Sequence, residues 1–532
     1  MTIAPPLRSA LRRSARAAGF RVALLLLAPL AAAAAVTPDA PHPRAVASPA
    51  YRVAADGLPV FTEQFKDVHY AAFTFTGRVE VTVRASAPIR RSAVSPRAAG
   101  VAAAVEGDTL RLSLDRPRRL VVTLNDGERL FLFADAPDPA APAPGQPGVT
   151  SVTDLGVDAT GARLETARLQ AAIDRVAAAH GVLYFPPGVY LTGTLSLKSH
   201  LTLYLAAGAL LLGSDRPADY PVDPGHREPE TLADARTWSN LGSDMTFSRL
   251  LLVDQATHVR VAGRGVIDGQ GRIIRGLGRP PNLVRIRSSS HVTFADVILR
   301  DPAAWNSHLL ASDHVTYRGV RILNDRSVPN TDGIDPDSSR DVLIESCFIY
   351  SGDDPIAIKT SGNAGLLRPV ERVTVRGNIF LTHTSAMKLG SESRADIRDV
   401  LFADNDVLEA DRAITLSCMD GARYERIRFV DNRVERLLFK TQQRPLLIHV
   451  RRRQPAAPVG LIRDVLIRDL TVDDPGPNPS RIAGFAADHA AAGIRFERLT
   501  IAGRVRTSAA DAGIELGPYT QDVTFHPSSP AP

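Results

Sequence analysis

Cysteine is scarce in this sequence: only Cys347 and Cys418 occur among its 532 residues. Two cysteines exclude the framework of several disulfide bonds on which many small exported domains depend. Neither has the spacing of a metal ligand or an obvious base beside it, so we expect two buried thiols. The composition, 44% apolar and 23% charged, excludes a disordered chain, and the length allows more than one globular domain.

A long apolar run is also missing. The most apolar stretch, VALLLLAPLAAAAAV at 22–36, is too short to span a bilayer. Because it follows several arginines and ends in small residues near a plausible cleavage point, it predicts a signal peptide over residues 1–35. We therefore expect a secreted or periplasmic protein that does not contact the membrane after leader cleavage. The alternative is an uncleaved amphipathic anchor.

Most of the excess positive charge belongs to this leader. Its five arginines are Arg8, Arg12, Arg13, Arg16 and Arg21. Removing them lowers the formal net charge from +6 to +1. The remaining charge gives no reason to expect a nucleic-acid partner.

Residues 47–135 show the alternation of β-strands. VEVTV at 79–83 and TLRLSL at 109–114 place apolar residues on one face, and NDG at 125–127 is a strong hairpin signal. This pattern predicts a small β-sandwich. The proline-rich stretch at 136–148, APDPAAPAPGQPG, predicts a linker.

A repeat occupies most of the remaining chain. After one expected helix, in which Leu169, Ile173 and Val176 follow helical spacing, segments such as HVTFADVIL and DVLFADNDV recur nine times. Their first aliphatic residues, from Val259 to Ile494, are 23 to 38 residues apart. Short strands at this period predict a parallel β-solenoid, whereas a β-propeller needs a longer unit of four strands. We expect an all-β protein with a parallel β-helix over 149–520, preceded by the sandwich.

Three asparagines recur at one position of this repeat. Asn378, Asn405 and Asn432 are 27 residues apart, and Cys347 has the same position one coil earlier. Side-chain amides stacked in this way can bond to one another along a solenoid. We interpret them as a structural ladder, not as ligands.

Acidic residues meet on two successive coils. Asp353 and Asp354 follow a glycine turn in SGDDPIAIKT, and Asp332 lies 21 residues earlier, about one coil away. Residues one coil apart stack at about 4.8 Å, so the three carboxylates should converge. Such crowding raises at least one pKa and can pair an acid with a base, as glycosidic bond cleavage requires. The alternative is that each Asp only bonds nearby turn amides.

The motifs around these acids resemble those of polygalacturonases in glycoside hydrolase family 28. They are AAWNSHL at 303–309, NTDGID at 330–335, GDDPIAIK at 352–359 and LGSES at 389–393. The resemblance implies a right-handed parallel β-helix of the pectin-lyase-like type. It also implies hydrolysis of a pectin-like polysaccharide or oligosaccharide with inversion at the anomeric carbon, without metal or other cofactor.

The same resemblance implies a catalytic role for each of the three acids. It implies that Asp353 protonates the leaving oxygen, while Asp354 and Asp332 activate the water. Asn330 and Asp335 would orient Asp332. Inversion places the acid and the base roughly 6.5–9.5 Å apart.

The substrate-binding motifs depart from the family. Where it has a Gly-His-Gly turn, this chain has Ser385, with His383 nearby, and its Arg-Ile-Lys strand is reduced to Arg412. Lys359 and Lys388 are candidates to replace the missing cations that would bind a uronate carboxylate. Their alternative is ordinary exposed lysine. A neutral sugar therefore stays open as a substrate.

Two further segments are expected near the sugar. Trp305 and His308 are candidates for the floor of the binding groove, with core packing as the alternative for Trp305. The polar insertion at 214–247 is long enough to close one end of the groove, which would favour cleavage from chain ends.

Three other functions stay open beside this one. They are a carbohydrate-binding β-helix without catalysis, a hydrolase of a non-uronate polysaccharide, and a polysaccharide lyase. A lyase needs a basic residue beside the uronate and commonly Ca²⁺, and no cation-rich site is evident from the motifs.

Overall fold

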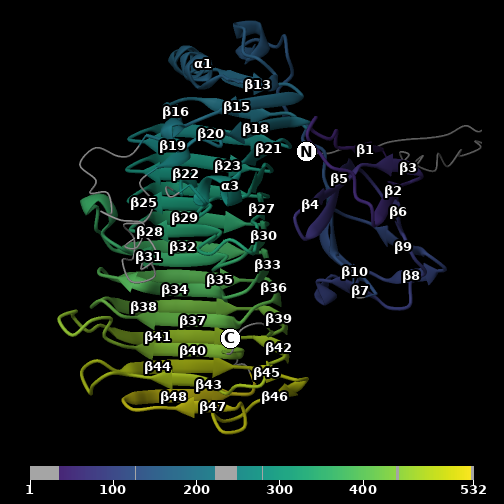
Figure 1. Cartoon of the computed structure of the whole chain (residues 1–532). Coiled ribbons are helices and arrows are strands. Elements are labelled where there is room, and N and C mark those ends of the chain that lie inside the picture. The colour runs from purple at the N-terminus through teal and green to yellow at the C-terminus, as the bar shows by residue number, and fades with distance from the viewer. Residues whose placement is uncertain (1–34, 126, 222–247, 278–279, 439–441, 529–532) are drawn as a thin grey trace, which may run out of the picture.

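The computed structural model describes residues 35–125, 127–221, 248–277, 280–438 and 442–528. Nearly all of the predicted leader and most of the insertion at 214–247 lie outside these ranges. None of the helices in the described ranges is long and apolar enough to cross a membrane. The chain forms a long β-helix with a smaller β domain at its side (Figure 1).

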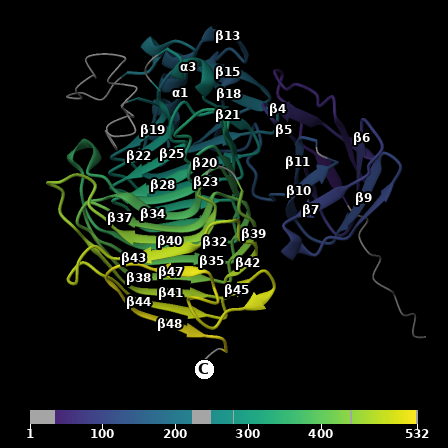
Figure 2. The same ribbon diagram turned by 60° about the horizontal axis from the view of Figure 1, so that its bottom comes forward.

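Three sheets stack coil upon coil to form the β-helix, as the view partly along its axis shows (Figure 2). We call them the marker sheet, the domain-facing sheet and the site sheet. The marker sheet contains β12 (Val149–Ser151), β14 (Val182–Phe185), β17 (Thr202–Leu205), β20 (Thr257–Gly263), β23 (Ser290–Ala295), β26 (Asp313–Arg318), β29 (Arg340–Glu345), β32 (Val370–Arg376), β35 (Ile397–Ala403), β38 (Arg423–Val430), β41 (Leu461–Arg468), β44 (Ala491–Glu497) and β48 (Thr520–His526).

The other two sheets complete each coil. The domain-facing sheet contains β13 (Thr160–Leu164), β15 (Gly188–Thr192), β18 (Ala209–Gly213), β21 (Val266–Asp268), β24 (Ile298–Arg300), β27 (Arg321–Leu323), β30 (Phe348–Ser351), β33 (Ile379–Thr382), β36 (Asp406–Glu409), β39 (Arg433–Arg436), β42 (Thr471–Asp474), β45 (Thr500–Ile501) and β46 (Arg504–Val505). The site sheet contains β16 (Leu195–Leu197), β19 (Arg249–Asp254), β22 (Asn282–Arg287), β25 (Ser307–Leu310), β28 (Ile334–Asp337), β31 (Ile356–Thr360), β34 (Ser385–Ser393), β37 (Arg412–Cys418), β40 (Arg444–Val450), β43 (Ser480–Ala483) and β47 (Ile514–Leu516).

The repeating aliphatic residues stack in register and fill the interior. Val259 pairs with Val292, Val292 with Val315, and the series continues to Ile494. Each strand therefore buries its apolar face only against its neighbours, as a solenoid requires. The prediction of a parallel β-helix is confirmed. One more coil follows, because Ile494 pairs with Val523 in β48, beyond the predicted end at 520.

The expected helix is α1 (Thr166–Ala178), which buries Leu169, Ile173 and Val176 at the N-terminal end of the β-helix. Helix α3 (Gly271–Arg275) is a short connection after β21. Within the described ranges, 3₁₀ turns occur at η1 (Arg97–Ala99), η2 (Thr153–Leu155), η3 (Pro217–Asp219) and η5 (Asn363–Gly365).

The N-terminal domain consists of two packed sheets. One contains β1 (Val36–Pro38), β4 (Thr62–Phe65), β5 (Val68–Phe75), β7 (Ser92–Ser95), β10 (Arg118–Leu124) and β11 (Arg129–Asp135), and the other contains β2 (Tyr51–Ala55), β3 (Leu58–Val60), β6 (Val79–Ala85), β8 (Ala103–Glu106) and β9 (Thr109–Leu114). Side chains of both sheets share one core. The architecture is the expected sandwich, but its first strand begins at Val36 and not at 47.

The sandwich packs on the β-helix through the outer face of its first sheet. Strand β5 is buried at every position, because one face lines the sandwich core and the other meets the domain-facing sheet. The ring of Phe131 lies 4.8 Å from that of Phe348 and 5.3 Å from that of Tyr350. Arg321 forms a buried ion pair with Asp135. This interface was not predicted, because β5 and β11 are buried on both faces and lack the alternation that marks a strand with one buried face.

The asparagine ladder is confirmed. Asn378 Nδ2 donates to Asn405 Oδ1 at 2.9 Å, and Asn405 Nδ2 donates to Asn432 Oδ1 at 2.9 Å. One coil earlier, the backbone N–H of Cys347 donates to Asn378 Oδ1 at 2.8 Å. Both cysteines are buried free thiols, as expected.

Replacing Asn405 with alanine should therefore destabilise the β-helix. The change removes the acceptor of Asn378 and the donor to the carbonyl of Val375, and each unsatisfied buried group costs about 1–3 kcal/mol. Urea unfolding should detect the loss in the free energy of unfolding. Gln521→Ala, which removes an exposed amide from β48, is the matched control. Equal midpoints for both variants would contradict the ladder's contribution.

Candidate active site

The three predicted acids come together at one edge of the site sheet. Asp332 lies in the turn before β28, and Asp353 and Asp354 lie in the turn before β31. One carboxylate oxygen from each lies within 4.8 Å of the others. These nearest oxygens are closer than the roughly 6.5–9.5 Å that we expected between an inverting acid and base. Asp332 and Asp354 are 4% and 2% exposed, whereas Asp353 is half-buried and reaches solvent.

The ammonium group of Lys359 contacts the carboxyl group of Asp332. Its Nζ lies 3.2 Å from Asp332 Oδ2 and 3.2 Å from Asp335 Oδ2, and 3.7 Å from the centre of the Trp305 ring. Lys359 is only 3% exposed, so it is not the ordinary exposed lysine that was the alternative, and its ammonium group contacts the acids. The prediction that Asp335 supports Asp332 agrees with this shared ammonium group.

Burial and crowding change the protonation of these groups. Burial raises the pKa of Asp332 well above its usual range, although the ammonium group of Lys359 opposes the shift. Burial likewise raises the pKa of Asp335 to about 7. One cation therefore does not offset both carboxylates, and the cluster retains a proton near neutral pH. In such a cluster the proton belongs to the group as a whole.

The pKa of Asp354 is shifted in the opposite direction, below its usual value. Lys388 Nζ lies 2.5 Å from its Oδ2, while Thr384 Oγ1 and the backbone N–H of Ser385 donate to its Oδ1 at 2.8 and 3.0 Å. Burial alone would raise its pKa, but Lys388 and these hydrogen bonds hold the pKa of Asp354 below its usual value. Asp354 is therefore an ionised carboxylate, suited to accept a proton or orient a water.

The turn of Asp353 is fixed through its backbone. Its carbonyl oxygen accepts hydrogen bonds from Ser351 Oγ at 2.5 Å and from Thr382 Oγ1 at 2.7 Å. Its Oδ1 also accepts the backbone N–H of Asp354 at 2.9 Å. These contacts hold the turn, and Asp353 is more exposed than Asp332 and Asp354.

Two predicted sugar-contacting residues lie beneath the site instead. His308 is completely buried, and its Nε2 is 3.1 Å from Asp337 Oδ2. Burial lowers its pKa to about 4, so the ring is neutral. It packs edge-on against Trp305, which is 5% exposed. With so little accessible surface, neither side chain forms a sugar-binding floor, and core packing explains both.

The residues at the positions of the lost family motifs differ in burial and in their contacts. Ser385 is buried, and its hydroxyl accepts a hydrogen bond from Thr415 Oγ1 at 2.9 Å, so it supports Asp354 through its backbone and does not face the groove. His383 is half-buried in the bend between β33 and β34. Arg412 begins β37 beside Ser385 of the previous coil, and its charge helps to lower the pKa of Asp354.

Cations of later coils were not predicted. His449 in β40 accepts or donates a hydrogen bond with Ser417 Oγ at 2.8 Å. Burial, followed by the charges of Arg451, Arg412, Arg481 and Lys388, lowers its pKa to about 4. We call Lys388, Arg412, Arg451 and Arg481 the cationic cluster. Lys388 and Arg412 were expected from the sequence, whereas Arg451, which lies in the basic run HVRRR at 449–453, and Arg481 were not.

The same acids could in principle hold a metal ion, because three carboxylate oxygens converge. However, Lys359 and Lys388 already place ammonium groups against Asp332 and Asp354. A divalent cation would have to displace or approach these like charges, so the donor set fits acid–base chemistry better than metal binding.

Comparisons with known proteins find similarity to glycoside hydrolases over part of the chain. Residues 230–436 match the family described as Glycosyl hydrolases family 28, and residues 149–207 match Rhamnogalacturonase A/epimerase, pectate lyase-like. The chain is 30% identical over 285 residues to a probable polygalacturonase of Vitis vinifera, a match that covers 50% of this chain and 56% of that protein. It is 28% identical over 314 residues to an exo-poly-alpha-D-galacturonosidase of Dickeya chrysanthemi, covering 50% and 51%. The chain thus spans about half the length of the curated relatives it matches.

Solved structures share the fold. The family 28 exopolygalacturonase of Yersinia enterocolitica aligns with a TM-score of 0.58 at 18% identity, covering 86% of this chain and 94% of that one. A hyperthermoactive exopolygalacturonase of Thermotoga maritima aligns with a TM-score of 0.55 at 21% identity, covering 73% and 93%. Residues 230–436 of this chain therefore resemble the glycosyl hydrolases of family 28, and the chain shares the β-helix fold of the solved family 28 structures.

Proposed function

We propose that this protein hydrolyses glycosidic bonds of a galacturonan-like polysaccharide or oligosaccharide. The observation that carries the proposal is the meeting of Asp332, Asp353 and Asp354 within 4.8 Å, with different environments. A glycosidase needs one protonated and one ionised carboxyl group, and the lysine contacts of Asp354 provide the ionised one. The curated relatives are described as polygalacturonases, which supports the same reaction.

The proposed mechanism uses no group beyond these side chains. Asp353, the most exposed of the three, donates a proton to the glycosidic oxygen as the bond to the anomeric carbon breaks. Asp354 and Asp332 bind a water, and Asp354 accepts its proton as the water oxygen bonds to the anomeric carbon. Lys388 and Lys359 hold these two carboxylates in position.

The cationic cluster supports an anionic substrate. Arg451 and Arg481 are exposed, and Arg412 is half-buried. Guanidinium groups bind carboxylates in a two-pronged geometry that a neutral sugar does not need. We therefore favour a uronate over the neutral sugar that the sequence left open.

The stereochemical outcome follows from the exposure of the acids and not from their spacing. Nearest oxygens within 4.8 Å fall below the inverting range and resemble the about 5–5.5 Å of retaining enzymes. A retaining nucleophile must contact the anomeric carbon, however, and Asp332 and Asp354 are buried and bound to lysines. We propose that they act through a water, which gives inversion.

A digestion experiment tests the function. Purified protein is incubated with polygalacturonate and with neutral polysaccharides, and the first products are followed by proton nuclear magnetic resonance. We expect galacturonic acid or its oligomers, released with inverted anomeric configuration, from polygalacturonate alone. Release of sugars only from a neutral polysaccharide would refute the uronate assignment. Unsaturated products would indicate a lyase, retained configuration a covalent intermediate, and no release from any substrate a binding protein.

Export of the protein is a further proposal. We infer that residues 1–35 direct export, so that the protein meets an extracellular or periplasmic polysaccharide. Determining the N-terminal residue of protein recovered from outside the cytoplasm tests this: cleavage near residue 35 is expected, and an intact N-terminus would favour the anchor.

A further inference from the structure

Five histidines form a column along the outside of the β-helix. Each stands at or just before the start of a marker-sheet strand, β14, β17, β20, β23 or β26, and the parallel pairing of these strands places the five one coil apart. All five are exposed. We call this set the histidine column, and its members are His180, His200, His258, His291 and His314.

The imidazole rings of the column stack on one another. The ring centres of His258 and His291 are 4.7 Å apart, as are those of His291 and His314, and in both pairs the planes are parallel to within 1°. The ring of His200 lies 5.2 Å from that of His258, and the ring of His180 lies 4.4 Å from that of His200. Neighbouring ring nitrogens are therefore roughly one strand spacing of 4.8 Å apart.

The backbone gives every histidine of the column the same conformation. Their φ angles lie between 53° and 62°, in the left-handed region that few residues other than glycine adopt. The same turn recurs on successive coils, so the rings project from equivalent points. The column is therefore arranged before any ligand binds, and a ligand does not have to order the backbone.

The run of imidazoles has a defined end. On the next coil, the position that corresponds to His314 holds Asp341. Its carboxylate is already bound by Arg372, whose Nε lies 2.6 Å from Asp341 Oδ1. From this coil onward, an ion pair takes the place of the stacked rings.

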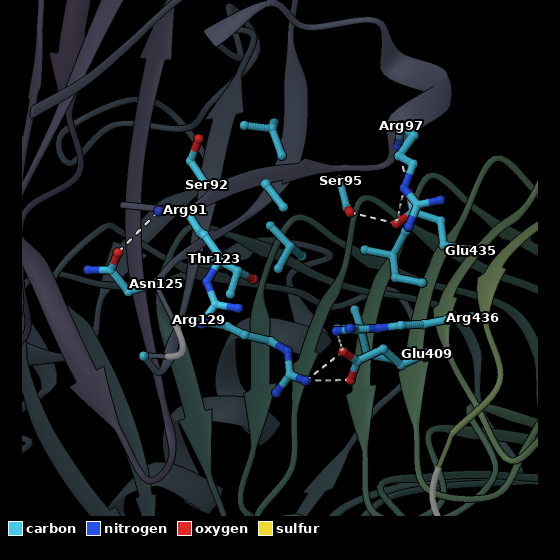
Figure 3. Close-up of a pocket in the computed structure, with 16 residues that line it drawn as sticks. Arg91, Ser92, Ser95, Arg97, Thr123, Asn125, Arg129, Glu409, Glu435 and Arg436 are labelled. Atoms are coloured by element: carbon cyan, nitrogen blue, oxygen red, sulfur yellow. Dashed lines mark hydrogen bonds and ion pairs between the residues drawn. The ribbon is translucent and has the colours of Figure 1, made fainter. Parts of the chain in front are cut away.

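The large cavity between the sandwich and the β-helix differs from the histidine column in its electrostatics. It has a volume of about 890 Å³. Arg129 and Arg436 both contact Glu409, and Arg97 contacts Glu435 (Figure 3). These charged groups of the cavity neutralise one another, whereas the imidazoles of the column offer nitrogen ligands at the surface.

We propose that the histidine column binds a divalent transition-metal ion, of which Zn²⁺ is the type, between two adjacent imidazoles. Imidazole is the commonest metal ligand in proteins and suits zinc, copper and nickel, whereas magnesium and calcium prefer oxygen ligands. The remaining ligands of the ion are water molecules, because the column is exposed. The inference does not depend on the proposed hydrolysis, since the catalytic acids precede strands of the site sheet and not of the marker sheet.

A small movement brings two rings to the geometry of a metal ion. Two nitrogens on one tetrahedral zinc ion are roughly 3.3 Å apart, because each lies about 2.0–2.1 Å from the metal. Nitrogens of neighbouring coils must therefore approach by roughly 1.5 Å. Exposed side chains can turn by this amount without disturbing the core. The rings of His180 and His200 are already inclined by 30°, so the column admits rings that are not parallel.

One histidine also has the outer partner that metal-binding imidazoles usually have. His258 Nδ1 lies 2.9 Å from Thr257 Oγ1. When Nδ1 donates its proton to this hydroxyl group, the lone pair of Nε2 is left for the metal ion. Such a hydrogen bond fixes the tautomer and the orientation of a metal-binding ring.

Two double variants test whether adjacent rings are required. His200→Asn combined with His291→Asn, the alternating variant, leaves three histidines of which no two are neighbours. His180→Asn combined with His314→Asn, the terminal variant, also leaves three histidines, but these are neighbours. Asparagine is the replacement because it tolerates a positive φ better than most residues. Calorimetry measures the binding of Zn²⁺, with Mg²⁺ as the second probe, and His526→Asn in β48 is the control at a single exposed histidine.

We expect the native protein, the terminal variant and His526→Asn to bind Zn²⁺ with similar affinity, and the alternating variant to bind it at least about tenfold more weakly. Even the loss of an outer partner of a metal ligand has an effect of this size. Zn²⁺ should also raise the unfolding temperature of the native protein more than Mg²⁺ does, because it binds the folded state. Equal Zn²⁺ affinity of the two double variants would overturn the proposal, since single imidazoles would then account for the binding. Equal effects of Zn²⁺ and Mg²⁺ on the native protein would overturn it as well.

Discussion

Replacing Asp353 with asparagine should lower the rate of polygalacturonate hydrolysis by about 10²–10⁴-fold, the usual contribution of a general acid. Asparagine keeps the side-chain oxygen that accepts the N–H of Asp354, so the turn should keep its shape. The amide cannot deliver a proton to the leaving oxygen. Steady-state kinetics with purified protein measure the loss, and the unfolding temperature should match that of the native protein.

A substrate with a better leaving group distinguishes the role of the general acid from the roles of the other two carboxylates. A nitrophenyl galacturonide needs little protonation when its bond breaks, so the Asp353→Asn enzyme should recover much of its relative activity on it. The Asp354→Asn enzyme should not, because its water still lacks an acceptor for the proton. Asp488→Asn, which changes a carboxylate that is 83% exposed, is the control and should be fully active. Full activity of Asp353→Asn on polygalacturonate would eliminate it as the acid.

The convergence of the three acids could be predicted because they lie in the coil repeat. Asp332 and Asp353 are about one coil apart, and stacking at this distance follows from parallel pairing alone. Asn378 and Asn405 were predictable for the same reason, since their separation equals one coil. Where the period is regular, a sequence position therefore indicates a place in space.

The partners of the acids could not be predicted in the same way. Whether Lys359 faces solvent or lies beneath Asp332 depends on the loops that cover the site sheet, and no period describes loops. Lys388 was named as a sugar ligand, yet its ammonium group meets Asp354. His449 lies within the longest interval of the repeat, between Ile427 and Val465, so the basic residues next to it were not aligned with the site.

The domain interface escaped prediction because one strand serves two cores. Alternation indicates a strand with one buried face, and β6 shows it clearly, with buried and exposed positions in turn. Strand β5 is buried on both faces, so its sequence lacks the alternation and resembles any apolar run. The position of a second domain on a solenoid depends on matching surfaces such as Phe131 against Phe348, which a single sequence does not display.

Replacing Lys359 with methionine should destabilise the protein by about 3–5 kcal/mol near pH 8, the usual cost of removing one partner from a buried ion pair. Lys359 lies 3.2 Å from both Asp332 and Asp335, and its loss leaves two buried carboxylates without a cation. Methionine keeps much of the side-chain volume against Trp305, so packing alone does not explain such an effect. Lys198→Met, at an exposed position, is the matched control. Chemical unfolding gives the free energies.

The pH dependence identifies the cause of this loss. Burial raises the pKa of Asp332 and of Asp335 in the folded protein, so the folded state binds more protons than the unfolded state between about pH 4 and pH 7. Their contribution to stability is therefore largest at low pH and declines as pH rises. Without Lys359 the two pKa values rise further, because the opposing positive charge is gone. The destabilisation of Lys359→Met should accordingly be much smaller at pH 5 than at pH 8, since protonated carboxyl groups need no cation. An equal loss at both pH values would mean that the lysine acts through packing, and the charge balance of the catalytic cluster would then need a different explanation.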